Sequence, residues 1–448
     1  MIMMGIVIGS GIYVTTGIMA QHIPSVPLIL LAWIVGGLLT LAGALTYSEL
    51  GAAMPEAGGL YIYLKEAYGP LFGFLFGWIL FLVYMTGGIA GLAAAFAEYF
   101  GTLFPSLSTN VKIFSKSIKI FNLTFKYSVS AGQLVAFAVI ILLSAVNYVG
   151  LIFGKIIQNI FTVIKIGTLI LFIFFGLTFG KTTPIDFSVN PGGISFSQLF
   201  VGFGIALIAV SWAFDGWNNI NFVAGEIKNP KRNLPLALIF GTVGITILYV
   251  LINFVYLSAI PINHLAGEVK VAEKASLILF GDFTTTIISI AVIVSIFGSI
   301  NGSILAGPRV YYAMAKDGLF FQKAASVHPK FKVPGFAIFV QALWSCLLVL
   351  SGNFEQLITF TMFISFVFWI AAAASVFKLR KKYPDLPRPY KTWGYPVVPA
   401  IFIVATVGIL INTLVEKPLE SLAGVGITLI GVPVYYFWKR KNTNFYEL

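Results

Sequence analysis

The feature that most constrains this chain is a succession of long apolar runs separated by short loops. Of its 448 residues, 58% are hydrophobic and 10% are charged, whereas an ordinary soluble domain carries about a quarter charged residues. A helix that crosses a bilayer needs about 20 mostly apolar residues. The runs therefore predict an all-α membrane protein with about twelve transmembrane helices, near residues 1–20, 25–49, 71–100, 131–149, 157–179, 197–224, 235–259, 283–311, 335–351, 355–377, 396–414 and 421–438.

The loops predict how these spans are oriented. Most Lys and Arg residues fall in alternate loops, such as 226–235 and 378–391, and positive charge marks the cytoplasmic side of a membrane. We therefore expect a multi-pass protein of the cell membrane with both termini in the cytoplasm. The net charge of +12 belongs to these loops, so the lipid bilayer is an expected partner and nucleic acid is not. The first run lacks a basic flank, and we expect a cytoplasmic leader before it.

Two of the spans contain residues that interrupt a helix. The first carries Gly9-Ser10-Gly11 near its middle, and the sixth carries Phe214-Asp215-Gly216-Trp217-Asn218. Unwound backbone at membrane depth must face protein or a water-filled cavity. The breaks are about five spans apart, which is the inverted-repeat pattern of secondary transporters. We expect one repeat over 1–180, a second over 181–382, and two additional spans over 383–448.

The two breaks offer opposite partial charges. Amide groups at Ser10 and Gly11 can attract a carboxylate, although small residues also allow close helix packing. Carbonyl groups of Ala213 and Phe214 suit an ammonium group. A substrate with both charges on neighbouring atoms is an α-amino acid.

Two side chains at the second break each have two interpretations. Asp215 either takes part in function, as intramembrane acids usually do, or caps a half-helix that starts at Gly216. Phe214 either closes over a substrate or packs as an ordinary aromatic side chain.

Lys165 lies at mid-membrane, where an ammonium group must face the bundle interior. Gln158 lies seven positions earlier and supports an inward polar stripe. Lys165 is either a fixed cation that joins spans one and eight or a proton carrier; snorkelling to the interface does not suit its depth. Ser299 and Asn301 are its expected hydrogen-bond partners.

Other chemistries find no support in the residues. No nucleophile, base and orienting group occur together, so the chain is not expected to be an enzyme. No metal-ligand spacing or phosphate-binding loop occurs, and no cofactor is expected. Cys346 is the single cysteine, which excludes an intrachain disulfide.

Four segments together are similar to a known family: GIVIGSGIYVTTG (5–17), LTLAGALTYSELGAAMPEAGGLYIYLKEAYGPLFGFLFGW (39–78), FDGWNNINFVAGEIKNPKRNLPLAL (214–238) and SIFGSINGSILAGPRVYYAMAKDGLF (295–320). They resemble the amino acid–polyamine–organocation (APC) superfamily, within it the L-type amino acid transporter branch and especially its bacterial serine/threonine exchangers. The resemblance implies a leucine-transporter-like fold of five plus five inverted spans, with helices one and six broken. It also implies sodium-independent exchange of small neutral L-amino acids.

The resemblance assigns roles to particular residues. It implies that Ser10 and Gly11 bind the substrate carboxylate and that Ala213, Phe214 and Gly216 line the amino-group and side-chain end, with Phe214 as a gate. Gly9, Ile12 and Asp215, taken from the breaks themselves, complete the predicted substrate-binding residues. Lys165 is expected where relatives bind sodium, with Ser299 and Tyr249 near it. The loop after span three lacks the cysteine that joins animal members to a heavy subunit, so no disulfide-linked partner is expected.

Alternative functions of this chain are proton-coupled symport and, less favoured, an amino-acid sensor or a channel.

Overall fold

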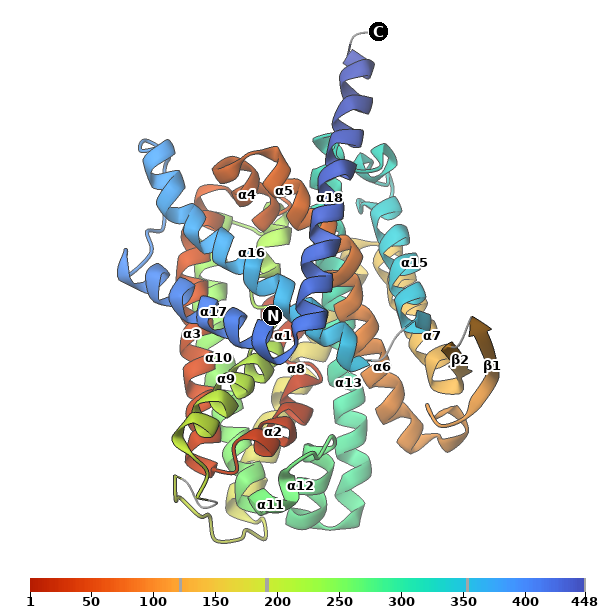
Figure 1. Ribbon diagram of the computed structural model, residues 1–448, viewed down its shortest axis with the longest axis vertical. Helices are drawn as coiled ribbons and strands as arrows, with labels where there is room; N and C mark the ends of the chain where they lie inside the picture. The colour runs from red at the N-terminus through yellow and green to blue at the C-terminus, as the bar shows by residue number, and fades with distance from the viewer. Residues whose placement is uncertain (121–122, 190–192, 352–353, 447–448) are drawn as a thin grey trace.

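The chain is a bundle of α-helices that mostly run along one axis, as Figure 1 shows for the computed structural model. The structure describes residues 1–120, 123–189, 193–351 and 354–446. Within these ranges, ten helices are long and apolar enough to cross a membrane. The broken first span and the slightly shorter apolar helix Gly335–Leu350 complete the twelve predicted spans.

The helices of spans one to five are α1 (Ile2–Val7), α2 (Gly11–His22), α3 (Val26–Ala53), α5 (Pro70–Ile79) continuing through a π-helical turn (Leu80–Tyr84) into α6 (Met85–Leu103), α7 (Ala131–Val149) and α8 (Leu151–Thr178). The later spans are α9 (Phe196–Ala213) with η3 (Asn219–Glu226), α10 (Pro230–Ala259), α13 (Asp282–Ala306) continuing into α14 (Pro308–Lys316), α15 (Gly335–Ser351), α16 (Phe354–Lys382), α17 (Val397–Glu416) and α18 (Pro418–Tyr446).

Short elements occupy the connections. They are α4 (Leu60–Tyr68), η2 (Pro105–Leu107), α11 (Ile262–Leu265), α12 (Val271–Phe280), η4 (Gln322–Ala325) and the strands β1 (Lys112–Ile120) and β2 (Leu123–Ser130). The strands form an antiparallel hairpin where the sequence predicts only a loop. Alternating apolar and polar residues, as in Ile-Lys-Ile at 118–120, are typical of a strand.

Two helices begin where the sequence supplies a complete capping box. At the start of α7, Ser130 and Gln133 each bond the other's backbone N–H, and Ser195 and Gln198 do the same at α9. Such a pair satisfies two of the amide groups that a helix start leaves without partners. The spans therefore begin close to the predicted positions 131 and 197.

Corresponding spans of the two predicted repeats pack against each other. Helix α2 contacts α9, α3 contacts α10, and α6 contacts α13. These are the pairs one–six, two–seven and three–eight, which a two-fold axis between inverted repeats would bring together. The contacts support the repeat boundaries of 180 and 382, which stay a prediction.

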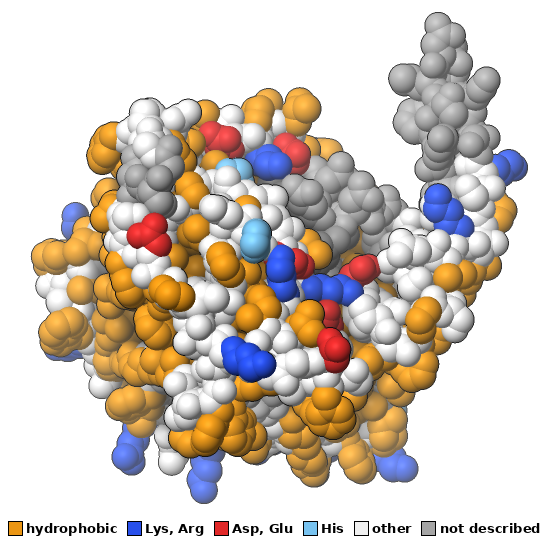
Figure 2. All heavy atoms as spheres, turned by 90° about the horizontal axis from the view of Figure 1, so that it is seen from below, with side chains coloured by type: hydrophobic (Ala, Val, Ile, Leu, Met, Phe, Trp, Pro, Cys, Tyr) orange, Lys and Arg blue, Asp and Glu red, His pale blue; other side chains and the backbone are white. Residues whose placement is uncertain are grey.

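The outer surface of the bundle is apolar. Large side chains such as Leu38, Phe240 and Val404 are more than half exposed although they belong to long helices. In Figure 2 hydrophobic side chains cover much of the perimeter of the face seen from below, and several charged side chains lie together near its middle. Exposed apolar surface of this extent is suited to lipid.

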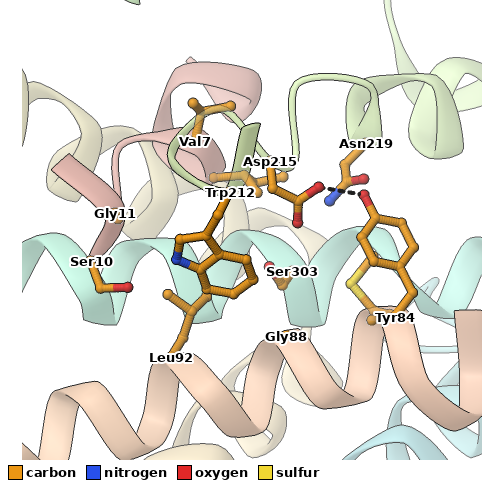
Figure 3. A pocket seen from close by; sticks show the side chains of 13 residues that line it. Val7, Ser10, Gly11, Tyr84, Gly88, Leu92, Trp212, Asp215, Asn219 and Ser303 are labelled. Atoms are coloured by element: carbon orange, nitrogen blue, oxygen red, sulfur yellow. Dashed lines mark hydrogen bonds between the residues drawn. The ribbon is translucent and has the colours of Figure 1, made fainter. Parts of the chain in front are cut away.

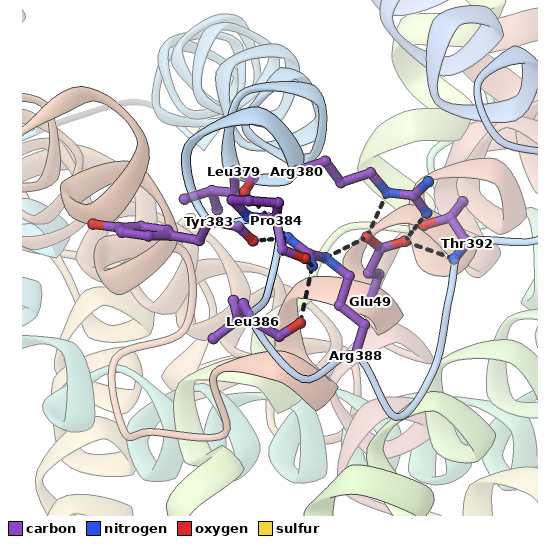
Figure 4. Close-up of polar contacts among 8 residues, drawn as sticks. All are labelled: Glu49, Leu379, Arg380, Tyr383, Pro384, Leu386, Arg388 and Thr392. Carbon is purple, nitrogen blue, oxygen red and sulfur yellow. Dashed lines mark hydrogen bonds and ion pairs between the residues drawn. The ribbon is translucent and has the colours of Figure 1, made fainter.

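Glu49, near the end of α3, anchors the loop that follows α16 (Figure 4). Its carboxylate accepts hydrogen bonds from the Arg380 Nε and Nη2 groups at 2.8 and 2.6 Å and from the Thr392 backbone N–H at 2.7 Å. The Arg388 Nε lies 3.5 Å away. The side chain of Glu49 is only 3% exposed, so the two guanidinium groups compensate for its burial.

We expect Glu49→Gln to lower the melting temperature of the purified protein by several degrees. The uncharged amide of the glutamine would face two guanidinium groups. Breaking a buried ion pair costs about 3–5 kcal/mol, and the cost is smaller here because Arg380 is 24% exposed. Thermal unfolding in detergent measures the change. Lys381→Gln is the control, since Lys381 is exposed on the same helix end. Equal melting temperatures for the two variants would contradict the anchoring role.

Candidate functional site

The first span is broken where the sequence predicts it. Helix α1 ends at Val7 and α2 begins at Gly11, with Ser10 as its N-cap residue. The first amide groups of α2 have no acceptor within their own helix because no turn precedes them. The break therefore places a helix N-terminus, with its partial positive charge, inside the bundle.

The sixth span is also broken, but its second half differs from the prediction. Helix α9 ends at Ala213, Gly216 has a φ of +89°, and the chain resumes as the 3-10 helix η3 at Asn219. Of the two interpretations of Asp215, a cap for a half-helix starting at Gly216 does not hold, because the chain forms a turn there and not a helix. The positive φ turns the chain at Gly216, and the Asp215 carboxylate instead accepts the hydroxyl of Tyr84 at 2.8 Å.

The two breaks lie directly against each other. A Cβ atom on Gly11 would lie 2.6 Å from the Ala213 Cα atom, so the two backbones touch. The Tyr249 hydroxyl reaches a carbonyl of each break, Val7 O at 3.0 Å and Ala213 O at 3.2 Å. The Ala213 carbonyl, predicted to be available to an ammonium group, thus already has a partner.

A small polar cavity of about 40 Å³ lies beside this junction. Figure 3 shows the Trp212 indole across its middle, between Ser10 and the pair Asp215–Tyr84. The cavity is lined by Ile6, Val7, Gly9, Ser10, Gly11, Tyr84, Met85, Gly88, Leu92, Trp212, Asp215, Asn219 and Ser303. Both breaks and two further spans therefore contribute to one site.

Two polar atoms of this lining lack a hydrogen-bond partner among the described residues. They are Ser10 Oγ and Asn219 Oδ1, and their side chains are only 1% and 3% exposed. Buried polar atoms normally have a partner, because leaving one unpaired costs about 1–3 kcal/mol. The cavity therefore contains two buried polar atoms that are available to a ligand.

Lys165 lies behind the first break and holds its freed carbonyl groups. Its Nζ atom lies 2.8 Å from Gly5 O, 2.7 Å from Ile8 O and 2.8 Å from Ser295 O, with Ser299 Oγ at 3.2 Å. The side chain is 1% exposed. Lys165 thus joins the end of α1 to α13.

The sequence led us to expect Asn301 as a hydrogen-bond partner of Lys165, but the structure gives Asn301 other partners. Its amide group donates to Gln158 Oε1 at 2.8 Å and to Gly154 O at 3.2 Å, and its oxygen accepts from Asn147 at 2.8 Å. Ser299 and Asn301 are two positions apart, so their side chains point to different sides of the helix. The predicted inward stripe of Gln158 and Lys165 is present, because both side chains are buried.

The predicted site residues fall into three groups. Those that line the cavity are Gly9, Ser10, Gly11 and Asp215. Those that build the junction without lining the cavity are Ile12, Ala213, Phe214 and Gly216. Those that hold the breaks from outside are Lys165, Ser299 and Tyr249.

Phe214, the predicted gate, does not line the cavity of the two breaks. The Phe214 ring packs on Tyr249 and Trp33, with ring centres 5.1 and 6.3 Å apart, and it lines another cavity. Trp212 lines the polar cavity instead. The sequence could have indicated Trp212 as a lining residue, because it lies two residues before the predicted gate. Tyr84 and Ser303 lie in other spans, and nothing in the sequence marked them.

An all-α bundle with two broken helices around a central polar cavity is the architecture of secondary transporters. The model of the amino acid permease family matches residues 1–436, and the chain belongs to this family. It is 33% identical over 447 residues to the serine/threonine exchanger SteT of Bacillus subtilis (strain 168), covering 99% of this chain and 96% of that protein.

Two mammalian proteins show the breadth of the similarity. The large neutral amino acids transporter small subunit 2 of Mus musculus is 32% identical, with 98% of this chain and 80% of that protein covered. The human cystine/glutamate transporter is 29% identical, with 98% and 84% covered. The similarity extends over nearly the whole chain in each case. The protein is therefore an amino acid transporter of the membrane and not an enzyme.

Proposed function

We propose that this protein exchanges small neutral L-amino acids, such as serine, threonine and alanine, across the cell membrane by alternating access and without sodium. The observation that carries the proposal is the cavity lined from both broken helices. The amide end of α2 at Ser10 and Gly11 suits a substrate carboxylate. The Asp215 carboxylate lies in the lining of the same cavity and suits an ammonium group.

The choice of substrate size follows from the walls of the cavity. It measures about 40 Å³ in this conformation, where one water needs roughly 10–15 Å³. Trp212 lies across the cavity and would have to move to admit a substrate whose side chain is larger than that of threonine. The similarity to a protein named as a serine/threonine exchanger supports the same substrate class.

The absence of sodium coupling is proposed from Lys165. Its ammonium group lies within 2.8 Å of three backbone carbonyl oxygens, which are the kind of ligands that a sodium ion would use at unwound helix ends. A permanent positive charge there replaces the ion.

The termini are proposed to face the cytoplasm, because the basic loops 226–235 and 378–391 are assigned to that side by their positive charge.

Counterflow in proteoliposomes tests the proposal. We expect labelled serine, threonine or alanine to enter only when unlabelled amino acid is present inside, with equal rates in sodium and choline buffers. Labelled uptake without internal substrate would contradict exchange, and dependence on sodium would contradict the role of Lys165.

Proton-coupled symport is the second candidate, and burial of Lys165 is the observation that favours it, because a desolvated lysine can release its proton. It predicts accumulation driven by an imposed pH gradient in vesicles without internal amino acid. Tight amino-acid binding without flux would instead indicate a sensor, and conductance far above transporter turnover would indicate a channel.

A further inference from the structure

A second and larger hollow lies on the face of the molecule predicted to be cytoplasmic, where α7 ends and α15 begins. It measures about 600 Å³, within the range of roughly 300–1,000 Å³ that is usual for ligand pockets. Its lining includes Tyr148, Lys323, Ser326, His328, Gly335 and Phe339. A Cβ atom on Gly335 would lie 2.6 Å from the Tyr148 ring, so α7 and α15 are in direct contact at this hollow.

His328 is held in one orientation in the lining. Its Nδ1 atom accepts the backbone N–H groups of Lys330 and Phe331, both at 3.3 Å. The ring stacks on Phe331 with centres 4.6 Å apart and meets the Tyr148 ring at 5.7 Å. Because Nδ1 is an acceptor, the ring proton lies on Nε2. The pocket thus contains an oriented hydrogen-bond donor.

The charge around this pocket is positive. Lys323 lines it, and Lys330 and Lys332 are exposed in the same loop. The residues that line it include no Asp or Glu. None of the ion pairs found among the described residues uses these three lysines. The complementary ligand is an anion.

An apolar surface continues from the pocket along α15. Phe339, Leu343 and Leu347 are 58%, 51% and 48% exposed, and their spacing of four residues places them on one face of the helix. Since α15 is an apolar helix of the bundle, this face is directed into lipid. The ligand that satisfies both parts is an amphiphile with an anionic head and apolar chains.

We propose that this pocket binds an anionic phospholipid. The phosphate of the headgroup is held by the Lys323 ammonium group and the His328 Nε2–H group, and an acyl chain lies along Phe339, Leu343 and Leu347. Basic pockets between helices on the cytoplasmic side of membrane proteins are suited to such headgroups. The site is separate from the transport cavity and does not depend on the transported substrate.

Melting temperatures of the full chain in detergent test the proposal. The probes are dioleoylphosphatidylglycerol, dioleoylphosphatidylcholine, glycerophosphoglycerol and inorganic phosphate. We expect phosphatidylglycerol to raise the melting temperature and the other three to have little effect. Lys323→Gln should require about fivefold more phosphatidylglycerol for half of the shift, the usual effect of one surface lysine. Phe339→Gln should also weaken the binding of phosphatidylglycerol. It removes an apolar contact to the acyl chain and leaves the charge of the pocket unchanged.

The matched control is Lys231→Gln, which removes one exposed lysine from the first turn of α10 on the same predicted face. It should leave the phosphatidylglycerol titration unchanged. Each variant is compared with its own melting temperature without lipid, so that a change in the stability of the variant itself is subtracted. Equal stabilisation by phosphatidylcholine would overturn the proposal. Stabilisation by glycerophosphoglycerol or phosphate alone would overturn it in favour of a soluble anion. An equal loss in Lys231→Gln would overturn it in favour of unspecific surface charge.

Discussion

Replacing Lys165 with methionine is expected to lower amino-acid exchange at least about 100-fold, because hydrogen bonds to a charged group contribute about 1.5–3 kcal/mol each and several would be lost at once. Three backbone carbonyl groups, of Gly5, Ile8 and Ser295, would lose the ammonium group that they share. The hydroxyl groups of Ser295 and Ser299 would then be the remaining side-chain donors between α13 and the end of α1, and the more loosely held break would change the shape of the cavity. Counterflow of labelled serine measures the effect.

The control for this prediction is Lys155→Met, which removes an exposed lysine from the same helix and should exchange normally. Size-exclusion profiles of both variants separate loss of transport from loss of folding. Exchange by Lys165→Met at the normal rate would contradict the fixed-cation role. Normal exchange combined with loss of pH-driven accumulation would instead identify Lys165 as a proton carrier.

Gly11→Val is expected to abolish exchange while the protein still inserts into the membrane. A branched side chain at this position would occupy the predicted carboxylate site. The structure adds a stronger reason, since a Cβ atom would lie 2.6 Å from Ala213 Cα and must push α2 away from α9. Overpacking of this kind costs about 1–3 kcal/mol, so even Gly11→Ala should lower the exchange rate about tenfold.

Gly167→Val provides the matched comparison for Gly11→Val. A Cβ atom on Gly167 would have no atom within 4 Å, and the residue lies in the long membrane helix α8. We expect this variant to exchange at a rate close to normal. Proteoliposome uptake by the two valine variants, reconstituted to equal protein content, measures the difference. Substantial exchange by Gly11→Val would show that the two breaks need not touch.

The spans could be predicted because the forces that define them are local. A run of about 20 apolar residues is long enough to cross the bilayer wherever it occurs, and capping boxes such as Ser130–Gln133 mark where a helix starts. The breaks were also visible, since Gly9-Ser10-Gly11 and Asp215-Gly216 weaken a helix by their own backbone and side-chain properties. The hairpin at 112–130 was missed, although its residues alternate in polarity.

The direction of side chains at the breaks could not be predicted in the same way. Phe214 and Trp212 are both aromatic residues beside the second break, and the packing of the end of α9 against its neighbours decides which of them lines the cavity. The partner of Asp215 is Tyr84, which lies 131 positions earlier in the chain. No periodicity within a single span can identify a contact of that length.

The sequence by itself determined that this chain is a multi-span membrane protein, where two of its helices come apart, and that an ammonium group is buried at mid-membrane. These properties follow from hydropathy, helix propensity and the cost of burying charge, which act within a few turns of the chain. Only the tertiary structure decided that the two breaks touch, that Lys165 binds three carbonyl groups of other helices, and that Trp212 covers the cavity. Those contacts depend on how helices lean against one another, because packing joins residues that are hundreds of positions apart.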